Sequence, residues 1–279
     1  MDATTVRGVE IPTVGLGTWR LTGEQCWRSV RTALELGYRH VDTAQDYGNE
    51  RQVGTALRNS DVDREEVFLT TKLGFRNRGY DDVRRSIQES LAKLGTDYVD
   101  LLLIHWPNVT TPLGETLAAM DDLVDDGKIR HLGVSNFGLD RLDRARELTD
   151  HGILTDQVQY NPYWSQTELL DYCRIHDIAL TAYSPLAHGG VLDDPVLEAI
   201  GERYEKTAAQ VTLRWLVQQP NVLTVPKATT REHLAENVDV FDFELTDEEI
   251  DRIYRPSKPR ALAGFIKGRL RETCPLGNV

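Results

Sequence analysis

Short, continuously apolar segments alternate with longer amphipathic segments through most of the chain. Residues 81–94 carry apolar side chains at spacings of four, four and three, which predicts a helix with one apolar face. Asp81 and Gly95 are expected to cap the two ends of this helix. Residues 101–104 read Leu-Leu-Leu-Ile, a run that is typical of a parallel strand buried on both faces. The pattern therefore predicts an α/β fold built around a parallel sheet.

Eight predicted strands alternate with helices. The strands are expected at residues 12–17, 40–42, 67–72, 99–105, 132–135, 157–160, 179–183 and 223–226. The helices are expected at residues 23–36, 50–59, 81–94, 113–125, 139–149, 166–176, 231–238 and 247–254, with two more within 195–218. Eight alternations fit a closed barrel or a doubly wound sheet, and the first strand lacks the Gly-x-Gly-x-x-Gly motif that would favour the open sheet. We therefore predict a (β/α)8 TIM barrel, preceded by a β-hairpin of residues 4–6 and 9–11 and followed by a short C-terminal helix and tail.

The length of 279 residues suits one such barrel, which typically needs roughly 250 residues, so a single domain over residues 1–279 is expected. The sequence contains no run of 18 uncharged apolar residues, and its first residues lack the pattern of a signal peptide. We therefore expect a cytoplasmic protein that does not interact with a membrane. Cys26, Cys173 and Cys274 do not have the spacing of a metal site, so we expect reduced thiols and no metal.

The net charge of the chain is −12 and its pI is about 5.1, which argues against nucleic acid as a partner. The chain has 25 arginines but only 7 lysines, and 25 aspartates against 19 glutamates. One explanation is a GC-rich genome together with ordinary solvated acidic faces. The other is a halophilic protein, whose acidic self-repulsion is screened at high salt. The coincidence of few lysines with many aspartates favours the second explanation.

Four side chains that could take part in catalysis lie at or just after the ends of neighbouring predicted strands. Asp42 ends the second strand, Tyr47 lies in the loop after it, Lys72 ends the third strand and His105 ends the fourth. Each residue alone also has a structural explanation, such as a loop cap, a surface charge or a core side chain. Because the C-terminal ends of the strands of a barrel share one rim, and adjacent strands lie about 4.8 Å apart, we expect the four to form one site. An ion pair between Asp42 and Lys72 is expected within it.

An ordered series of motifs runs along the chain to about residue 255. These motifs are GLGTW at 15–19, YRHVDTAQDYGNE at 38–50, TTKL at 70–73, HWP at 105–107, GVSNF at 133–137, DQVQYNP at 156–162, AYSPL at 182–186, VPKAT at 225–229 and LAEN at 234–237. In this series the chain resembles the aldo-keto reductase family, in particular small prokaryotic aldehyde, ketone or diketogluconate reductases.

The resemblance implies a role for each of the four residues. Tyr47 would donate a proton to the carbonyl oxygen while a nicotinamide cofactor supplies hydride. Lys72 would favour the phenolate and ease this donation, and Asp42 would hold Lys72 charged and oriented. His105 would orient the substrate oxygen. The resemblance also implies substrate-binding residues, namely Trp19, Tyr47, His105 and Trp106.

The resemblance further implies a binding site for NADPH. The cofactor-binding residues would be Thr18, Ser135, Asn136, Gln157, Tyr183, Ser184, Leu186, Lys227, Ala228, Thr229, Thr230, His233, Glu236 and Asn237. Lys227 follows the NADPH-preferring pattern, but Ala228 stands where that pattern has serine and His233 where it has arginine. A neutral histidine binds a 2′-phosphate less well than a guanidinium does. NADH is therefore expected to be used as well, unless Arg231 compensates.

The sequence thus predicts a monomeric enzyme that reduces small aldehydes, ketones, α-ketocarbonyls or open-chain sugars with a nicotinamide cofactor. Two alternatives stay open. One is a cofactor-binding regulatory or structural subunit on the same fold. The other is an unrelated barrel that binds phosphorylated substrates at the rim around Lys227.

Overall fold

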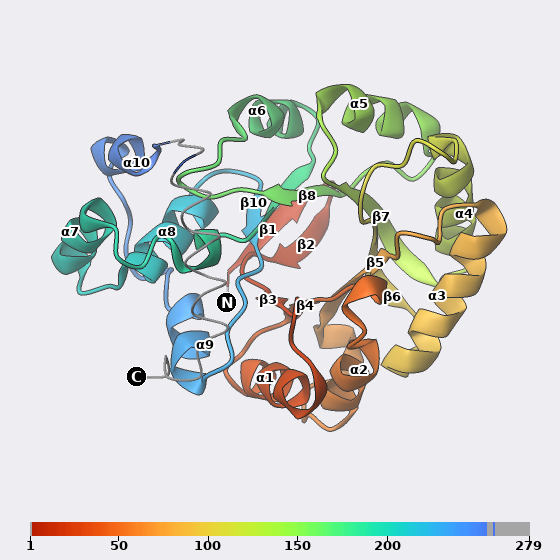
Figure 1. Ribbon diagram of the computed structural model, residues 1–279, viewed down its shortest axis with the longest axis horizontal. Coiled ribbons are helices and arrows are strands. Elements are labelled where there is room, and N and C mark those ends of the chain that lie inside the picture. The colour runs from red at the N-terminus through yellow and green to blue at the C-terminus, as the bar shows by residue number, and fades with distance from the viewer. Residues whose placement is uncertain (1, 256–258, 260–279) are drawn as a thin grey trace.

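The computed structural model describes residues 2–255 and residue 259. Within them, eight parallel strands form one sheet in chain order (Figure 1). These strands are β3 (Leu16–Gly17), β4 (His40–Asp42), β5 (Phe68–Leu73), β6 (Val99–Ile104), β7 (Ile129–Ser135), β8 (Thr155–Gln159), β9 (Ala179–Tyr183) and β10 (Val222–Thr224). The sheet closes because Val14, just before β3, forms a parallel bridge with Thr224. The predicted (β/α)8 barrel is confirmed.

Helices lie between successive strands and after the last one, and they surround the barrel (Figure 1). They are α1 (Gly23–Glu35), α2 (Glu50–Arg58), α3 (Tyr80–Leu94), α4 (Leu113–Asp125), α5 (Leu139–Leu148), α6 (Thr167–Ile175), α7 (Pro195–Tyr204), α8 (Ala208–Val217), α9 (Arg231–Val238) and α10 (Asp247–Ile253). Three short 3-10 helices lie in the described loops, namely η1 (Gln45–Tyr47), η2 (Arg64–Glu66) and η3 (Ala187–Gly189).

The N-terminal hairpin closes the floor of the barrel. Its strands β1 (Ala3–Val6) and β2 (Val9–Pro12) pair antiparallel, and both residues of the turn at 7–8 have positive φ, at 52° and 77°. This is the backbone that a tight two-residue hairpin requires. Val6 and Ile11 are fully buried in a cluster with inward-facing residues of the barrel strands. The hairpin therefore seals the end of the barrel opposite the predicted site.

Strand β6 shows how the core divides into two parts. Leu101 and Leu103 point into the barrel and join the cluster of the hairpin, whereas Leu102 and Ile104 pack in the larger cluster between strands and helices. Alternate residues of a strand point to opposite faces, and here both faces are buried. This explains why the strand is continuously apolar rather than alternating.

The ends of α3 differ in one respect from the prediction. Gly95 ends the helix with a left-handed φ of 67°, as expected. Asp81 does not cap its start, because the N-cap is Gly79 and no side chain caps there. Instead, the amide of Tyr80 donates to Oε1 of Glu115 at 3.0 Å, so a neighbouring helix supplies the acceptor.

Several other boundaries also differ. The predicted strand 12–17 is reduced to β3, because Pro12 pairs with Ala3 in the hairpin. Strand β7 begins earlier than residue 132, since Ile129 already pairs with Val99. Cys26 and Cys173 are buried free thiols, and Cys274 lies outside the described residues, as does the predicted tail apart from residue 259. Among the described helices, none combines the length and apolarity that a membrane crossing needs.

Candidate active site

Three adjacent strands bring the predicted residues to one rim of the barrel. Asp42 is the last residue of β4, Lys72 precedes the last residue of β5, and His105 directly follows β6. Tyr47 ends η1, the 3-10 turn that leaves β4. The order of the strands along the chain is also their order in the sheet, so residues far apart in sequence meet at this rim.

Lys72 is fully buried and all three of its ammonium donors have acceptors. Its Nζ donates to Oδ1 of Asp42 at 2.5 Å, to the carbonyl oxygen of Thr43 at 2.9 Å and to the hydroxyl oxygen of Tyr47 at 3.3 Å. Burial lowers the pKa of Lys72, but Asp42 and Tyr47 outweigh it, so the pKa is raised. The other carboxylate oxygen of Asp42 accepts from Nε2 of Gln157 at 2.7 Å. The expected ion pair is present and Lys72 is held as a cation.

Two opposing effects set the pKa of Tyr47, and one of them is the expected effect of Lys72. Burial raises the pKa of the phenol, and Lys72 lowers it by less, so the pKa lies above its ordinary value. The sequence suggested only the effect of the neighbouring cation. The structure adds the loss of water, which disfavours the phenolate. Tyr47 is therefore a protonated phenol at neutral pH.

His105 lies edge-on to Tyr47, with ring centroids 5.7 Å apart. Burial lowers the pKa of His105, and Lys72 lowers it further, to about 4. Its Nδ1 is buried and has no hydrogen-bond partner among the described residues. Oδ2 of Asp46 lies 3.6 Å from this Nδ1 atom. The imidazole is thus neutral at pH 7 and can act as a neutral hydrogen-bonding group.

A cavity of about 970 Å³ opens beside these residues. The predicted residues that line it on the side of β3 to β6 are Trp19, Asp42, Tyr47, His105 and Trp106. Lys72 lies behind this wall. The predicted cofactor residues that line it are Ser135, Asn136, Gln157, Tyr183, Ser184, Leu186, Lys227, Ala228, His233, Glu236 and Asn237. The barrel therefore gathers most of the predicted residues around one cavity.

A hydrogen-bonded group of side chains lines part of this cavity. Asn136 has a positive φ of 63°, an uncommon conformation outside glycine. Its Nδ2 donates to the carbonyl oxygen of His105 and to Oγ of Ser135, each at 3.0 Å, and its Oδ1 accepts from the hydroxyl of Tyr183 at 2.8 Å. These bonds fix Asn136 and couple the ends of β6, β7 and β9.

Three predicted cofactor residues do not line the cavity. Thr18 is fully buried and its hydroxyl donates to the carbonyl oxygen of Asp42 at 2.9 Å. Thr230 caps α9 by accepting from the amide of His233 at 3.2 Å. Thr229 is exposed. Arg231 also faces away, since its Nη1 lies 2.9 Å from Oε2 of Glu35 on α1.

Other residues of the cavity were not predicted. They include Gly17, Asp46, Pro185, His188, Gly189 and Leu192. Only glycine fits at position 17, because a Cβ there would lie 2.4 Å from the carbonyl oxygen of Val225. His188 faces Trp19 edge-on with ring centroids 6.0 Å apart. Two glycines follow His188, and the first of them, Gly189, has a φ of 84°. This glycine pair was the available sequence signal for a turn beside the cavity.

Comparison with known proteins agrees with this geometry. The family model described as "Aldo/keto reductase family" matches residues 13–256. A glyoxal reductase of Bacillus subtilis (strain 168) is 42% identical over 247 residues, which cover 88% of this chain and 89% of that protein.

Two solved structures extend the comparison to the fold. A crystal structure assigned as a 2,5-diketo-D-gluconic acid reductase B has a TM-score of 0.91 and 46% identity, covering 94% of this chain and 93% of that one. An aldo-keto reductase of Bombyx mori in complex with NADP has a TM-score of 0.84 and 37% identity, covering 91% of this chain and 92% of that one. This chain therefore belongs to the aldo/keto reductase family and is an oxidoreductase that acts on carbonyl groups.

Proposed function

We propose that this protein reduces the carbonyl group of small aldehydes, ketones, α-ketocarbonyls or open-chain sugars to the alcohol with NADPH, and that Tyr47 donates the proton. The observation that carries the proposal is the position of the Tyr47 hydroxyl, 3.3 Å from the buried Lys72 ammonium and beside the neutral His105. A phenol backed by a cation can release its proton to an oxygen that gains negative charge, because the cation stabilises the phenolate left behind.

The cavity suits a dinucleotide in addition to a small carbonyl compound. Its volume of about 970 Å³ lies near the upper end of the usual range for small-molecule sites. The side chains of Ser135, Asn136 and Gln157 offer amide and hydroxyl groups that would hold the nicotinamide carboxamide, and the ring of Tyr183 would stack on the nicotinamide. When bound, the nicotinamide supplies a hydride to the carbonyl carbon.

The chain's own residues then divide the remaining tasks. His105, neutral because burial holds its pKa near 4, would donate a hydrogen bond to the carbonyl oxygen rather than act as a second acid. Tyr47 would deliver the proton to that oxygen. Lys72 and Asp42 would keep the phenol in place, because the Lys72 ammonium contacts the hydroxyl of Tyr47 and is itself held by the carboxylate of Asp42. Trp19 and Trp106 would form apolar walls around the substrate.

We also propose that NADPH is used with a weak preference over NADH. Lys227 and His233 both line the cavity and would face the adenosine 2′ position. Arg231 is paired with Glu35 and would not replace the arginine that the NADPH-preferring pattern has at position 233. A 2′-phosphate would then gain one permanent charge partner rather than two.

We further propose that the protein is a monomer and acts in the cytoplasm. Support for a reducing compartment comes from Cys26 and Cys173, which are unpaired thiols. Size-exclusion chromatography with light scattering tests the monomer.

Assays of the purified protein with glyoxal, methylglyoxal and an aldose, each with NADPH and with NADH, test the proposal. We expect oxidation of both cofactors, fastest with the dicarbonyls because they are the most electrophilic. Tight NADPH binding without turnover of any carbonyl compound would contradict the proposal and favour the regulatory-subunit alternative.

A further inference from the structure

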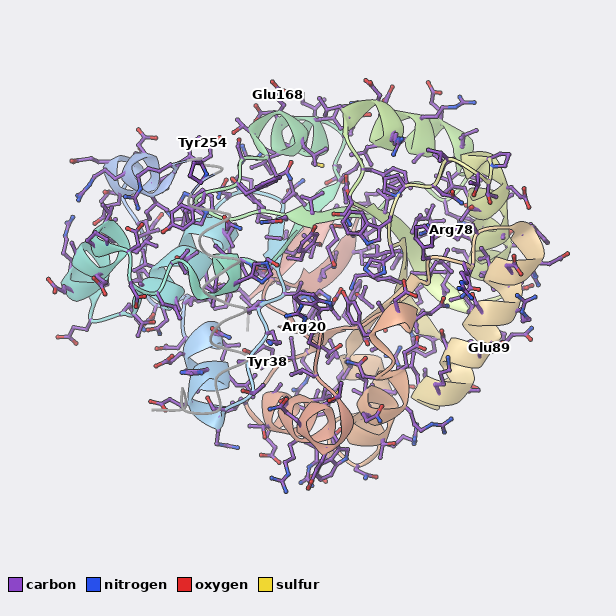
Figure 2. All side chains as sticks on the ribbon, in the orientation of Figure 1. Arg20, Tyr38, Arg78, Glu89, Glu168 and Tyr254 are labelled. Carbon is purple, nitrogen blue, oxygen red and sulfur yellow. The ribbon has the colours of Figure 1, made fainter. Side chains whose placement is uncertain are left out.

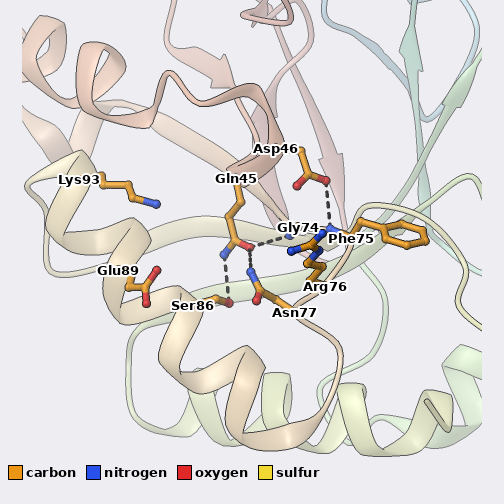
Figure 3. A pocket seen from close by; sticks show the side chains of 9 residues that line it. All are labelled: Gln45, Asp46, Gly74, Phe75, Arg76, Asn77, Ser86, Glu89 and Lys93. Atoms are coloured by element: carbon orange, nitrogen blue, oxygen red, sulfur yellow. Dashed lines mark hydrogen bonds between the residues drawn. The ribbon is translucent and has the colours of Figure 1, made fainter. Parts of the chain in front are cut away.

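The 3-10 turn η1 separates the large cavity from a smaller one. The smaller cavity, of about 350 Å³, lies between η1, the segment after β5 and α3 (Figure 3). Gln45 faces only the smaller cavity, where its Oε1 accepts from the amide of Gly74 at 2.6 Å and from Nδ2 of Asn77 at 2.8 Å. Asp46 lines both cavities. Asp46 therefore belongs to the wall of the large cavity and directly precedes Tyr47 in η1.

The position of Asp46 is fixed by the backbone. Its Oδ2 accepts from the amide of Phe75 at 3.1 Å, which Figure 3 shows as a dashed line. The same oxygen lies 3.6 Å from Nδ1 of His105. The side chain of Asp46 is nevertheless 46% exposed, so its carboxylate is not enclosed by protein. Asp46 thus holds a carboxylate at the edge of the site where the substrate carbonyl would lie.

The other charged groups in this part of the site form an ion pair. Asp42 pairs with Lys72, which lies 2.5 Å away, and Lys72 has the larger effect of the two on the pKa of His105. His105 is neutral at pH 7 because its pKa is about 4. The remaining charged side chains that line the cavity, Lys227 and Glu236, come from the segment after β10 and from α9.

Two arginines lie near the same rim without lining the cavity (Figure 2). Arg20 stacks over the ring of Trp19, with 4.2 Å between its Cζ and the ring centroid. Arg78 is buried and donates to the carbonyl oxygen of Trp106 at 2.8 Å. The pKa of His105 shows which of the two nearby charges, Asp46 or Arg78, acts more strongly there. Burial and Lys72 lower this pKa most, and Asp46 raises it by more than Arg78 lowers it.

We infer that Asp46 makes the substrate site select against anionic carbonyl compounds, so that neutral and cationic substrates are preferred over keto acids and sugar acids. The inference rests on the proposed function. A substrate carboxylate bound beside His105 and Trp106 would lie within several ångströms of Asp46, whose half-exposed carboxylate is only partly screened by water. At that separation and an intermediate effective dielectric constant, like charges lower the rate with the anion by about tenfold.

A set of three benzaldehydes with the same skeleton tests this inference. They are methyl 4-formylbenzoate, 4-formylbenzoate and 4-(trimethylammonio)benzaldehyde, which are neutral, anionic and cationic. The values of kcat/KM are measured with NADPH at pH 8, where ordinary imidazoles are neutral. For Asp46→Asn we expect the anion-to-neutral ratio to rise about tenfold and the cation-to-neutral ratio to fall. Each ratio comes from a single protein preparation, so a partly inactive variant does not distort it.

Glu89→Gln is the matched control. Glu89 lies on α3 and lines only the smaller cavity, so this variant removes one negative charge outside the active site (Figure 3). Its ratios should equal those of the wild type. Equal ratios in Asp46→Asn and the wild type, with normal turnover, would overturn the inference and leave the proposed function intact. Changes of the same sign for anion and cation would also overturn it, since they indicate a steric effect. A wild type that reduces none of the three benzaldehydes, and none of glyoxal, methylglyoxal and the aldose, would overturn both.

Discussion

Nζ of Lys72, near the end of β5, lies 3.3 Å from the hydroxyl oxygen of Tyr47, at the end of the turn that follows the neighbouring strand β4. Lys72 is cationic and fully buried, whereas the pKa of Tyr47 is raised because burial outweighs the effect of Lys72. The cation therefore does not ionise the phenol in the free enzyme. Under the proposed function, it would stabilise the phenolate only once the proton has moved to a substrate oxygen.

Tyr47→Phe removes the hydroxyl but keeps the ring that packs edge-on against His105. We expect kcat for reduction to fall by about 100-fold or more, since this is the usual contribution of a positioned acid. The affinity for NADPH, measured by fluorescence titration, should stay unchanged. A variant that kept more than a tenth of the wild-type kcat would place the proton donor elsewhere.

Lys72→Met leaves the carboxylate of Asp42 buried without its cation, with Gln157 as its remaining side-chain donor. Breaking a buried ion pair in this way typically costs about 3–5 kcal/mol of unfolding free energy. The double variant Asp42→Asn with Lys72→Met should be more stable than Lys72→Met alone, because no unpaired charge remains. Urea unfolding monitored by tryptophan fluorescence measures both. Equal stabilities of the single and double variants would show that the unpaired carboxylate of Asp42 does not cause the loss of unfolding free energy.

Asp156 on β8 is a buried carboxyl whose Oδ2 has no hydrogen-bond partner within the described residues. Burial raises its pKa well above the usual value, and the amide of Phe137 lowers it by less. The folded protein therefore keeps a proton that the unfolded chain releases above about pH 4. Stability attributable to Asp156 is thus full below this pH and is lost as the pH rises toward the folded-state pKa.

The variant Asp156→Asn tests this effect, because its amide does not titrate and its oxygen can still accept from the amide of Phe137. The unfolding free energy of the variant relative to the wild type should increase with pH, by up to about 1.4 kcal/mol per pH unit. Unfolding curves at pH 5, 6 and 7 measure it. The slope is informative whatever constant offset the substitution introduces. A difference independent of pH would refute the raised pKa.

His233→Arg should tighten NADPH binding by about 1–3 kcal/mol, the usual contribution of a hydrogen bond to a charged group. NADH binding should hardly change, because NADH lacks the 2′-phosphate. Arg231→Ala is the control and should leave both affinities unchanged, since Arg231 pairs with Glu35. Titration of the two cofactors with each variant gives the dissociation constants. If His233→Arg leaves NADPH affinity unchanged, the side chain at position 233 does not reach the 2′ position.

The net charge of −12 gives the last prediction. If the acidic composition is an adaptation to high salt, the melting temperature should climb with KCl well into the molar range, because salt screens like-charge repulsion. Sucrose at matched osmolality serves as the uncharged control. A melting temperature that stays flat from 0.1 M KCl upward would leave genome composition as the explanation.

Features that repeat locally could be predicted from the sequence. The apolar runs and amphipathic spacings indicated eight strand–helix units, since each follows from residues within one turn or one strand. The placement of Asp42, Lys72 and His105 on one rim also followed, because sequential parallel strands of a barrel are neighbours. The cap of α3 could not be predicted, since its acceptor comes from Glu115 on another helix.

The sequence by itself thus determined the barrel and the residues available for chemistry at its rim. Only the tertiary structure decided their electrostatic state, because a pKa depends on how much water packing removes and on charges from distant segments. Burial, and not Lys72, governs the pKa of Tyr47. Packing likewise turns Arg231 toward Glu35 and gives Asp46 a place in the cavity wall. Such relations arise between residues that the chain brings together only on folding, so no local pattern records them.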